Sequence, residues 1–451
     1  MKDYDNLTHL SLNVRVYKKR WLILLVFSIN SLANSMLFTC ITSINLIISK
    51  YYGISPELTD WASNSFPFVF VFIALPFAYF MDSFGVRTLL LVGSSLNAIC
   101  VCLHLAGTFR QQGIWFVLAG QFVAAFSVGA YLQVTTVASV WFPESEQAIA
   151  TSIALACNII GNSMGYLQPS YMVPDSENMD KIYKGLFEMN ISHVAFLGMC
   201  LISTYLFFEE KPILPPSYAK AIVDNTNHPE QCVETPGFKT SLKTLITDKN
   251  FVIFSFVFGI SFGLNNMFLI CLNQMSTHIT NSTFIGWIGF FGNISSFFGI
   301  LMFAAILDKY KCYRKMTILL FSLQIVCWVL FSIVLLYLKT TVSLFLTYIL
   351  LSFCNVPFMT VGLTYVTELT YPIPEIFSTA LIMIFGSLCE VVFVLVFGKL
   401  IDEQLLFLMC TIVGGLYAVG FLLTFFIKEN LKRSQIESQK SSIPSTSPKG
   451  V

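Results

Sequence analysis

Residues 209–250 read EEKPILPPSYAKAIVDNTNHPEQCVETPGFKTSLKTLITDKN. This segment is polar and shows no hydrophobic periodicity. It is the one long polar interruption between Trp21 and Lys428, and six apolar runs of about 20 residues lie on either side of it. A run of that length crosses a bilayer as one helix. We therefore interpret residues 209–250 as a hinge loop between two halves of six membrane-spanning helices each.

The composition is that of a polytopic membrane protein. Of the 451 residues, 55% are apolar and 11% are charged, whereas soluble domains carry roughly 25% charged residues. The net charge of +1 does not decide for or against nucleic acid, but so few charged residues leave no basic face for phosphates, so we expect no nucleic-acid partner. No Cys-x-x-Cys pair occurs and the histidines are scattered, so we expect no metal site and no cofactor. No nucleophile–base arrangement or Gly-rich phosphate loop occurs, so we do not expect an enzyme.

The pattern predicts an all-α fold with twelve transmembrane helices in two pseudo-symmetric halves. The predicted spans lie near 21–49, 61–80, 88–107, 114–141, 148–173 and 191–208, then near 251–278, 284–307, 316–337, 341–365, 376–401 and 405–427. The expected organisation is a cytoplasmic N-terminal segment (1–20), a first half (21–208), the hinge loop (209–250), a second half (251–427) and a disordered cytoplasmic tail (428–451).

Lys and Arg gather on one side of the predicted membrane, at both ends of the chain and in the hinge loop. By the positive-inside rule, both termini and the hinge loop are cytoplasmic. The sequons at Asn190 and Asn281 fall on the opposite side, where we expect glycosylation. The plasma membrane is the expected location, with an internal membrane as the alternative.

The two halves carry matching loop charges. Asp82 and Arg87 follow the second predicted span, and Asp308 and Arg314 follow the eighth at nearly the same offset. This repeat is the layout of the major facilitator superfamily, in which substrate binds near the midplane between halves that rock. We predict that the four charges latch the cytoplasmic side when the protein is open outward. The alternative is that Asp82 and Arg87 are only interfacial loop charges.

Several short stretches together resemble one family of transporters. They are RWLILLVFS (20–28), YYGIS (51–55) with Asp60-Trp61, ASVWFP (138–143), EKPILPPS (210–217), LNQM (272–275), ELTYP (368–372) and GKL (398–400). From Val14 to Lys428 the chain looks like the feline leukaemia virus subgroup C receptor family of major facilitator transporters. The resemblance implies a eukaryotic facilitator. Members of that family are associated with choline and ethanolamine uptake, and haem export has also been proposed for them.

The resemblance implies positions for a choline site. The family's pocket uses a Trp in the first helix, a Gln in the fourth, a Tyr in the seventh and a Gln in the eleventh. Aligned from the flanking motifs, these positions hold Phe38, Ser127 or Val128, Asn266 and Ser387. A quaternary ammonium favours electron-rich ring faces. The change from Trp to Phe and the loss of Tyr therefore weaken the aromatic cage.

Glu390 lies about halfway along the eleventh predicted span and is the one acid that we place at membrane depth. An ionisable group there is costly and marks a functional site by default. Ser387 precedes it by three residues, so both share one face of the helix. We predict that Glu390 supplies negative charge to a cationic substrate. The alternative is a Glu that hydrogen-bonds one helix to another.

Two further groups of polar residues are candidates for the substrate path. In the first span, Asn34 and Phe38 lie on one stripe, which we expect to face a central cavity; interhelical hydrogen bonding is the alternative. In the seventh span, Asn265 and Asn266 follow Gly259 and Gly263. Local unwinding of that helix and close helix packing at its glycines are equally compatible with this pattern.

The sequence thus predicts a membrane transporter that moves a small solute by alternating access. Choline, ethanolamine or a similar organic cation is the expected substrate, and a monomer in the lipid bilayer is the expected state. Two alternatives stay open. One is a transporter of the same family for haem or another metabolite. The other is a receptor or scaffold that has the transporter fold and moves nothing.

Overall fold

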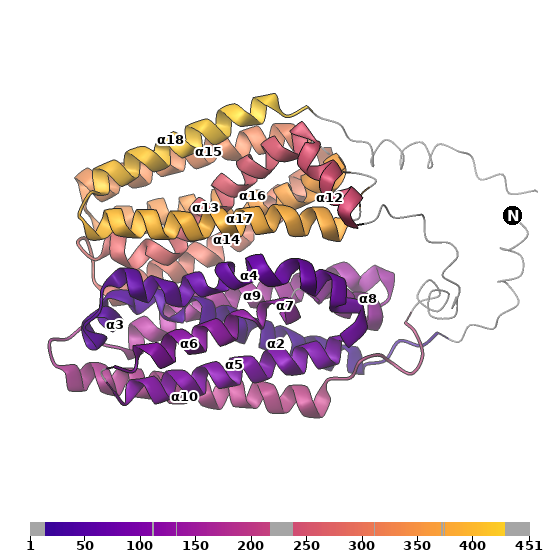
Figure 1. The fold of residues 1–451 in the computed structure, drawn as a ribbon, viewed down its shortest axis with the longest axis horizontal. Helices are drawn as coiled ribbons and strands as arrows, with labels where there is room; N and C mark the ends of the chain where they lie inside the picture. The colour runs from indigo at the N-terminus through magenta and orange to yellow at the C-terminus, as the bar shows by residue number, and fades with distance from the viewer. Residues whose placement is uncertain are drawn as a thin grey trace, which may run out of the picture. The chain divides into compact units, whose positions relative to one another are not determined.

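The computed structural model describes residues 14–110, 112–131, 133–216, 238–310, 312–370, 373 and 375–428, and every element in them is helical (Figure 1). The elements of residues 14–216 are α2 (Lys19–Cys40), η1 (Thr42–Ile44), α3 (Asn45–Tyr52), α4 (Pro56–Phe84), α5 (Val86–Thr108), α6 (Ile114–Ala125), α7 (Val128–Tyr131), α8 (Val134–Trp141), α9 (Glu144–Met172) and α10 (Met179–Phe207). Those of residues 238–428 are α12 (Phe238–Thr247), α13 (Lys249–Ser276), α14 (Ser282–Tyr310), α15 (Tyr313–Ile333), η3 (Val334–Leu338), α16 (Thr341–Thr370), α17 (Glu375–Asp402) and α18 (Leu406–Phe426).

The predicted membrane architecture is confirmed. Within the described ranges, eleven helical stretches are long and apolar enough to cross a membrane. The predicted span 148–173 is covered by α9, a helix of 29 residues that is not among the eleven. Its sequence is richer in polar residues, including Asn158, Asn162 and Gln168. The fold class is therefore that of an all-α polytopic membrane protein.

The described chain divides into two compact units. Unit 1 contains the described residues up to 216, together with Phe268–Ile294 and Val394–Glu403. Unit 2 contains the described residues from 238 to Met267, then Ser295–Phe393 and the residues from Gln404 to 428. The helices α13, α14 and α17 each contribute one segment to each unit.

Unit 1 is built around the packing of α2 against α9. Gly161 and Gly165 of α9 lie against the backbone of Leu32 and Met36 of α2, so that a side chain at either glycine would collide with α2. Small residues at such contacts let the backbones of membrane helices approach closely. The close approach positions the polar face of α2, which carries Asn34, inside unit 1.

Unit 2 has an aromatic core. Phe321 meets Phe358 edge to face, with ring centroids 5.0 Å apart, and Phe254 meets Tyr365 in the same way at 5.0 Å. All four side chains are buried. Edge-to-face pairs stabilise a fold beyond the area that they bury, so these rings fix how α13, α15 and α16 pack.

The helices differ from the predicted spans at several points, and three of these bear on the predictions made above. First, α4 begins at Pro56, five residues before the predicted span, because Pro is favoured in the first turn of a helix. Second, α10 begins at Met179, so most of the predicted loop 174–190 is helical. Third, α13 runs unbroken from Lys249 to Ser276, so the local unwinding considered for the seventh span is not found.

Parts of the predicted organisation lie outside the described residues. These parts are most of the N-terminal segment, residues 217–237 of the hinge loop and the tail beyond residue 428. The side chains of Asp82 and Asp308 also lie outside the described part of the chain.

Candidate functional site

The predicted residues of the seventh and eleventh spans meet in unit 2. Glu390 of α17 is 2% exposed, and its Oε2 accepts a hydrogen bond of 2.9 Å from Nδ2 of Asn266 on α13. Asn265 Nδ2 donates to Asn266 Oδ1 at 3.3 Å. Ser387 is buried one turn earlier on α17. The structure therefore brings two amides to the neighbourhood of a buried carboxylate.

Glycines of α13 make this meeting of helices possible. A Cβ at Gly263 would lie 2.9 Å from the ring of Phe393 and 3.0 Å from the backbone of Cys389 on α17. At Gly259 a Cβ would lie 2.7 Å from the ring of Phe385. Both glycines thus serve close helix packing, which was the alternative to local unwinding.

Asn34 and Ser127 belong to a buried network in unit 1. Asn34 Nδ2 donates to Ser127 Oγ at 2.7 Å and to Asn97 Oδ1 at 3.2 Å. Ser127 Oγ also donates to Asn97 Oδ1 at 2.8 Å, and Asn97 Nδ2 donates to the Tyr131 hydroxyl at 3.0 Å. The network joins α2 and α5 to the segment between α6 and α8. Asn97 and Tyr131 were not among the predicted site residues.

The fourth predicted span is interrupted where Ser127 lies. Helix α6 ends at Ala125, α7 covers Val128–Tyr131, and α8 starts at Val134. Transporters build substrate sites from such discontinuous helices, because unwound backbone is tolerated at membrane depth where it lines a cavity or is buried in protein. The sequence left local unwinding open as one of two alternatives for the seventh span, whereas the structure interrupts the helix in the fourth span, and also in the first between Cys40 and Asn45.

Phe38 packs into the core of unit 1. Its ring meets the ring of Phe66 edge to face at 5.3 Å, and its carbonyl accepts a 3.2 Å hydrogen bond from Ser63 Oγ on α4. The side chain is partly buried. One face of α2 thus presents both Phe38 and Asn34 toward other helices of unit 1.

A second buried carboxylate, Asp60, was missed by the sequence-based prediction. It is 3% exposed in α4, and Gln274 Nε2 donates to Oδ1 at 2.9 Å and to Oδ2 at 3.0 Å. Asn45 of α3 also donates to Oδ1. The pair Ser55-Pro56 signals a helix start and would have placed Asp60 inside the span rather than before it.

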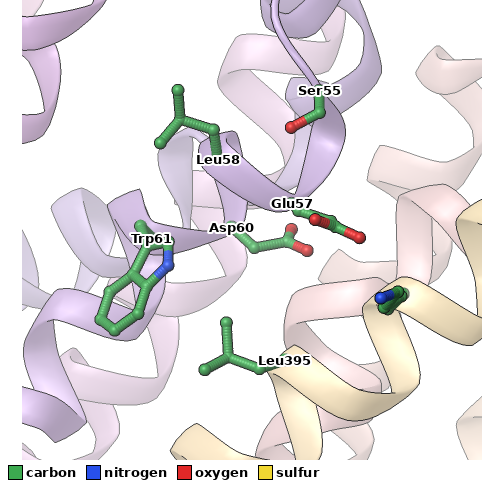
Figure 2. A pocket seen from close by; sticks show the side chains of 7 residues that line it. Ser55, Glu57, Leu58, Asp60, Trp61 and Leu395 are labelled. Atoms are coloured by element: carbon green, nitrogen blue, oxygen red, sulfur yellow. The ribbon is translucent and has the colours of Figure 1, made fainter.

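Asp60 lines a cavity of about 410 Å³ in unit 1 (Figure 2). Its polar lining is Ser55, Glu57, Asp60 and Lys399, and its apolar lining is Leu58, Trp61 and Leu395. The residues come from the start of α4 and the last turns of α17. Figure 2 shows the carboxylates of Glu57 and Asp60 between the Trp61 indole and the ribbon of α17.

The two predicted latch arginines occupy equivalent places in their halves. Arg87 Nη2 donates to the Tyr205 carbonyl at 3.4 Å, and Arg314 Nη2 donates to the Phe425 carbonyl at 2.8 Å. Both carbonyls lie in the last turn of a helix, α10 or α18, where a cation is favourable. Glu210, from the segment predicted as the hinge loop, accepts hydrogen bonds from the backbone N–H groups of Val86 and Arg87 at 2.7 Å.

The two predicted glycosylation sequons differ in accessibility. Asn281 is exposed in the turn before α14, and its Oδ1 accepts a 2.9 Å hydrogen bond from the Phe284 N–H. Asn190 is 3% exposed within α10. A glycan needs an accessible asparagine, so the geometry favours Asn281.

Comparisons with known proteins agree with this architecture. A family model described as Major Facilitator Superfamily matches residues 23–375. The human choline/ethanolamine transporter FLVCR2 is 27% identical over 434 residues, which are 94% of this chain and 80% of that protein. The mouse choline/ethanolamine transporter FLVCR1 is 27% identical over 446 residues, which are 94% of this chain and 78% of that protein. The resemblance predicted from the short motifs is confirmed.

Solved structures share the fold at low sequence identity. A D-xylose-proton symporter superposes with a TM-score of 0.70 at 13% identity, over 91% of this chain and 98% of that one. A bacterial homologue of the human lysosomal transporter Spinster superposes with a TM-score of 0.64 at 12% identity, over 92% of this chain and 95% of that one.

Proposed function

Because this chain belongs to the major facilitator superfamily, we propose that it is a facilitator for choline, ethanolamine or a similar organic cation. The relatives that are named choline/ethanolamine transporters motivate the choice of substrate. The observation that carries the proposal is the carboxylate of Glu390, 2% exposed in a membrane-spanning helix. A charged group at that depth is costly and marks a substrate or ion pathway by default.

Within unit 2, Glu390 supplies the negative charge that attracts the cation. Asn266 orients the carboxylate through its 2.9 Å hydrogen bond, and Asn265 orients Asn266. Ser387 adds a hydroxyl one turn away. A carboxylate replaces the attraction of ring faces that an aromatic cage would provide for an ammonium group.

Asn34, Phe38 and Ser127 are the substrate-path residues that we propose for the first half. The interruption of the helix at Ser127 supports this role, since broken helices line the sites of many carriers. The network with Asn97 holds Asn34 and Ser127 in place. Their contribution is therefore to position polar groups and backbone rather than to supply charge.

The orientation follows from the loop charges. We propose that both termini and the hinge loop are cytoplasmic, that the protein is a plasma-membrane monomer, and that Asn281 carries the glycan. The pairs Asp82–Arg87 and Asp308–Arg314 latch the cytoplasmic side. Membrane potential then draws a cation inward with about 2.3 kcal/mol per charge per 100 mV.

Uptake of labelled choline and ethanolamine by cells that express the full chain tests the proposal. Glu390→Gln removes the charge and is expected to reduce uptake at least about tenfold, a change worth roughly 1.4 kcal/mol. The matched control is Glu403→Gln, because Glu403 is an exposed acid just beyond the end of α17. Uptake that survives Glu390→Gln would make Glu390 a structural residue, and no uptake by the unchanged chain would contradict the substrate.

The same assay with labelled haem distinguishes a transporter for an organic cation from one for haem, the main alternative. Haem is a large dianionic amphiphile, and a buried carboxylate such as Glu390 opposes its binding. We expect no haem movement by the unchanged chain and none by Glu390→Gln. A receptor or scaffold with this fold would move none of the three compounds.

A further inference from the structure

We propose that the cavity at the start of α4 is a second binding site, for a small ammonium cation, separate from Glu390. This goes beyond the proposed function, because it concerns a site that transport at Glu390 does not require. The cavity has a volume of about 410 Å³ and is formed within unit 1 by α4 and the end of α17. Small-molecule sites typically enclose roughly 300–1,000 Å³.

The walls of the cavity match the chemistry of an ammonium group. Trp61 contributes an indole, the side chain that attracts cations most strongly through its ring face. Glu57 contributes an exposed carboxylate. Leu58 and Leu395 offer apolar contacts to the methyl or methylene groups that an organic ammonium carries.

Asp60 forms a fixed polar floor. Both of its oxygens accept hydrogen bonds from Gln274, and Asn45 holds Oδ1 as well, so the carboxyl group keeps one orientation. Gly398 of α17 leaves the space beside it open, since a Cβ at that position would lie 2.9 Å from Asp60 Oδ2. A site whose groups are held in place before binding loses less entropy when the ligand arrives.

Lys399 sets the affinity of this site. Its side chain lines the same cavity, and within the described residues neither Lys399 nor Glu57 has an ion-pair partner within 4 Å. Its ammonium group therefore repels a second cation in the cavity. Removal of this charge should strengthen binding, an effect that a merely damaged protein does not produce.

Binding of labelled tetramethylammonium to the purified full chain in lipid nanodiscs tests the proposal. Measurement in the Glu390→Gln background removes any contribution of binding at Glu390 to the signal. In that background we expect Lys399→Met to tighten binding by about three- to tenfold. We expect Trp61→Leu to weaken it by about tenfold and Glu57→Gln to weaken it by about threefold.

The control variant is Lys181→Met, which removes another exposed lysine from α10, a helix that does not line the cavity. Equal effects of Lys181→Met and Lys399→Met would overturn the proposal, because the gain would then reflect general surface charge. Absence of binding in the Glu390→Gln background would also overturn it, as would weaker binding in Lys399→Met. Failure of choline uptake in cells alone would contradict the proposed function and leave this site intact.

Discussion

Asp60 and Glu390, two of the buried acids in the described part of the chain, are held in different ways. Asp60 accepts hydrogen bonds from two amides, Asn45 of α3 and Gln274 of α13, and both of its oxygens are engaged. Glu390 accepts from the single amide of Asn266 through Oε2. A buried polar network rigidifies a fold when its hydrogen bonds are complete. Both carboxyl groups join helices, but Asp60 connects α4 to α3 and α13 with both of its oxygens, whereas Glu390 connects α17 to α13 through one oxygen.

The largest expected effect is that of Asp60→Leu. The change leaves the amides of Asn45 and Gln274 buried without their acceptor, and it should destabilise the protein by about 3 kcal/mol. Unfolding of purified protein in mixed detergent micelles measures this loss. Glu390→Leu strands one amide and should cost about half as much. Equal losses in the two variants would remove the distinction between the carboxylates.

Substitution by the isosteric amide removes the charge of each carboxyl group and leaves its volume unchanged. In Asp60→Asn the side-chain oxygen can keep both donors at the Oδ1 position, but the NH2 group at the Oδ2 position then faces the Gln274 donor, and we expect a loss of about 1–2 kcal/mol. Glu390→Gln keeps an oxygen for Asn266, so its loss of stability should stay below about 0.5 kcal/mol while uptake falls. The same micelle unfolding assay, paired with uptake in cells, separates stability from transport. A stable Asp60→Asn would show that its hydrogen bonds contribute little.

A smaller effect is expected from Gly398→Ala. The added methyl group would lie 2.9 Å from Asp60 Oδ2, and overpacking of this kind should cost about 1 kcal/mol. The control is Gly415→Ala in α18, where nothing lies within 4 Å of the added Cβ. That control should be neutral or slightly stabilising, because Ala favours helix more than Gly does. If Gly398→Ala does not change the stability, the packing around Asp60 has room for the added methyl group.

The smallest expected effect is that of Glu57→Gln. Its carboxylate is exposed and has no ion-pair partner within 4 Å in the described chain, so thermal unfolding should not change measurably. The same variant should weaken tetramethylammonium binding in nanodiscs. A clear fall in Tm would show that Glu57, like Asp60, stabilises the packing of α4.

The fold was predictable from the sequence because membrane helices are encoded locally. Each span needs its own apolar run, since every backbone group must be satisfied within the bilayer. The first residues of the helices were harder to predict from the sequence. The predicted span began at residue 61 because the apolar run begins after Asp60. The pair Ser55-Pro56, however, marks the start of α4.

The candidate site was predictable in part. Glu390 and Asn266 were both chosen, one from its depth and the other from the family alignment, and the structure brings them within hydrogen-bond distance. The partners of Asn34 could not be found in this way. Asn97 reaches it from a helix 63 residues away in sequence, and such pairings depend on how helices pack rather than on local pattern.

The composition of unit 1 has a consequence for the synthesis of the protein. Gln274 and Gly398, which flank Asp60, lie in segments of the second half of the chain. Because a ribosome delivers the chain from its N-terminus, at roughly 5–20 residues per second, Asp60 enters the membrane well before these partners exist. Until then its carboxyl group lacks the Gln274 amide. The nascent first half is therefore an incomplete unit, in which Asp60 stays without this partner in contact with insertion factors or lipid. For the same reason, truncated chains that end in the hinge loop should be degraded by cellular quality control.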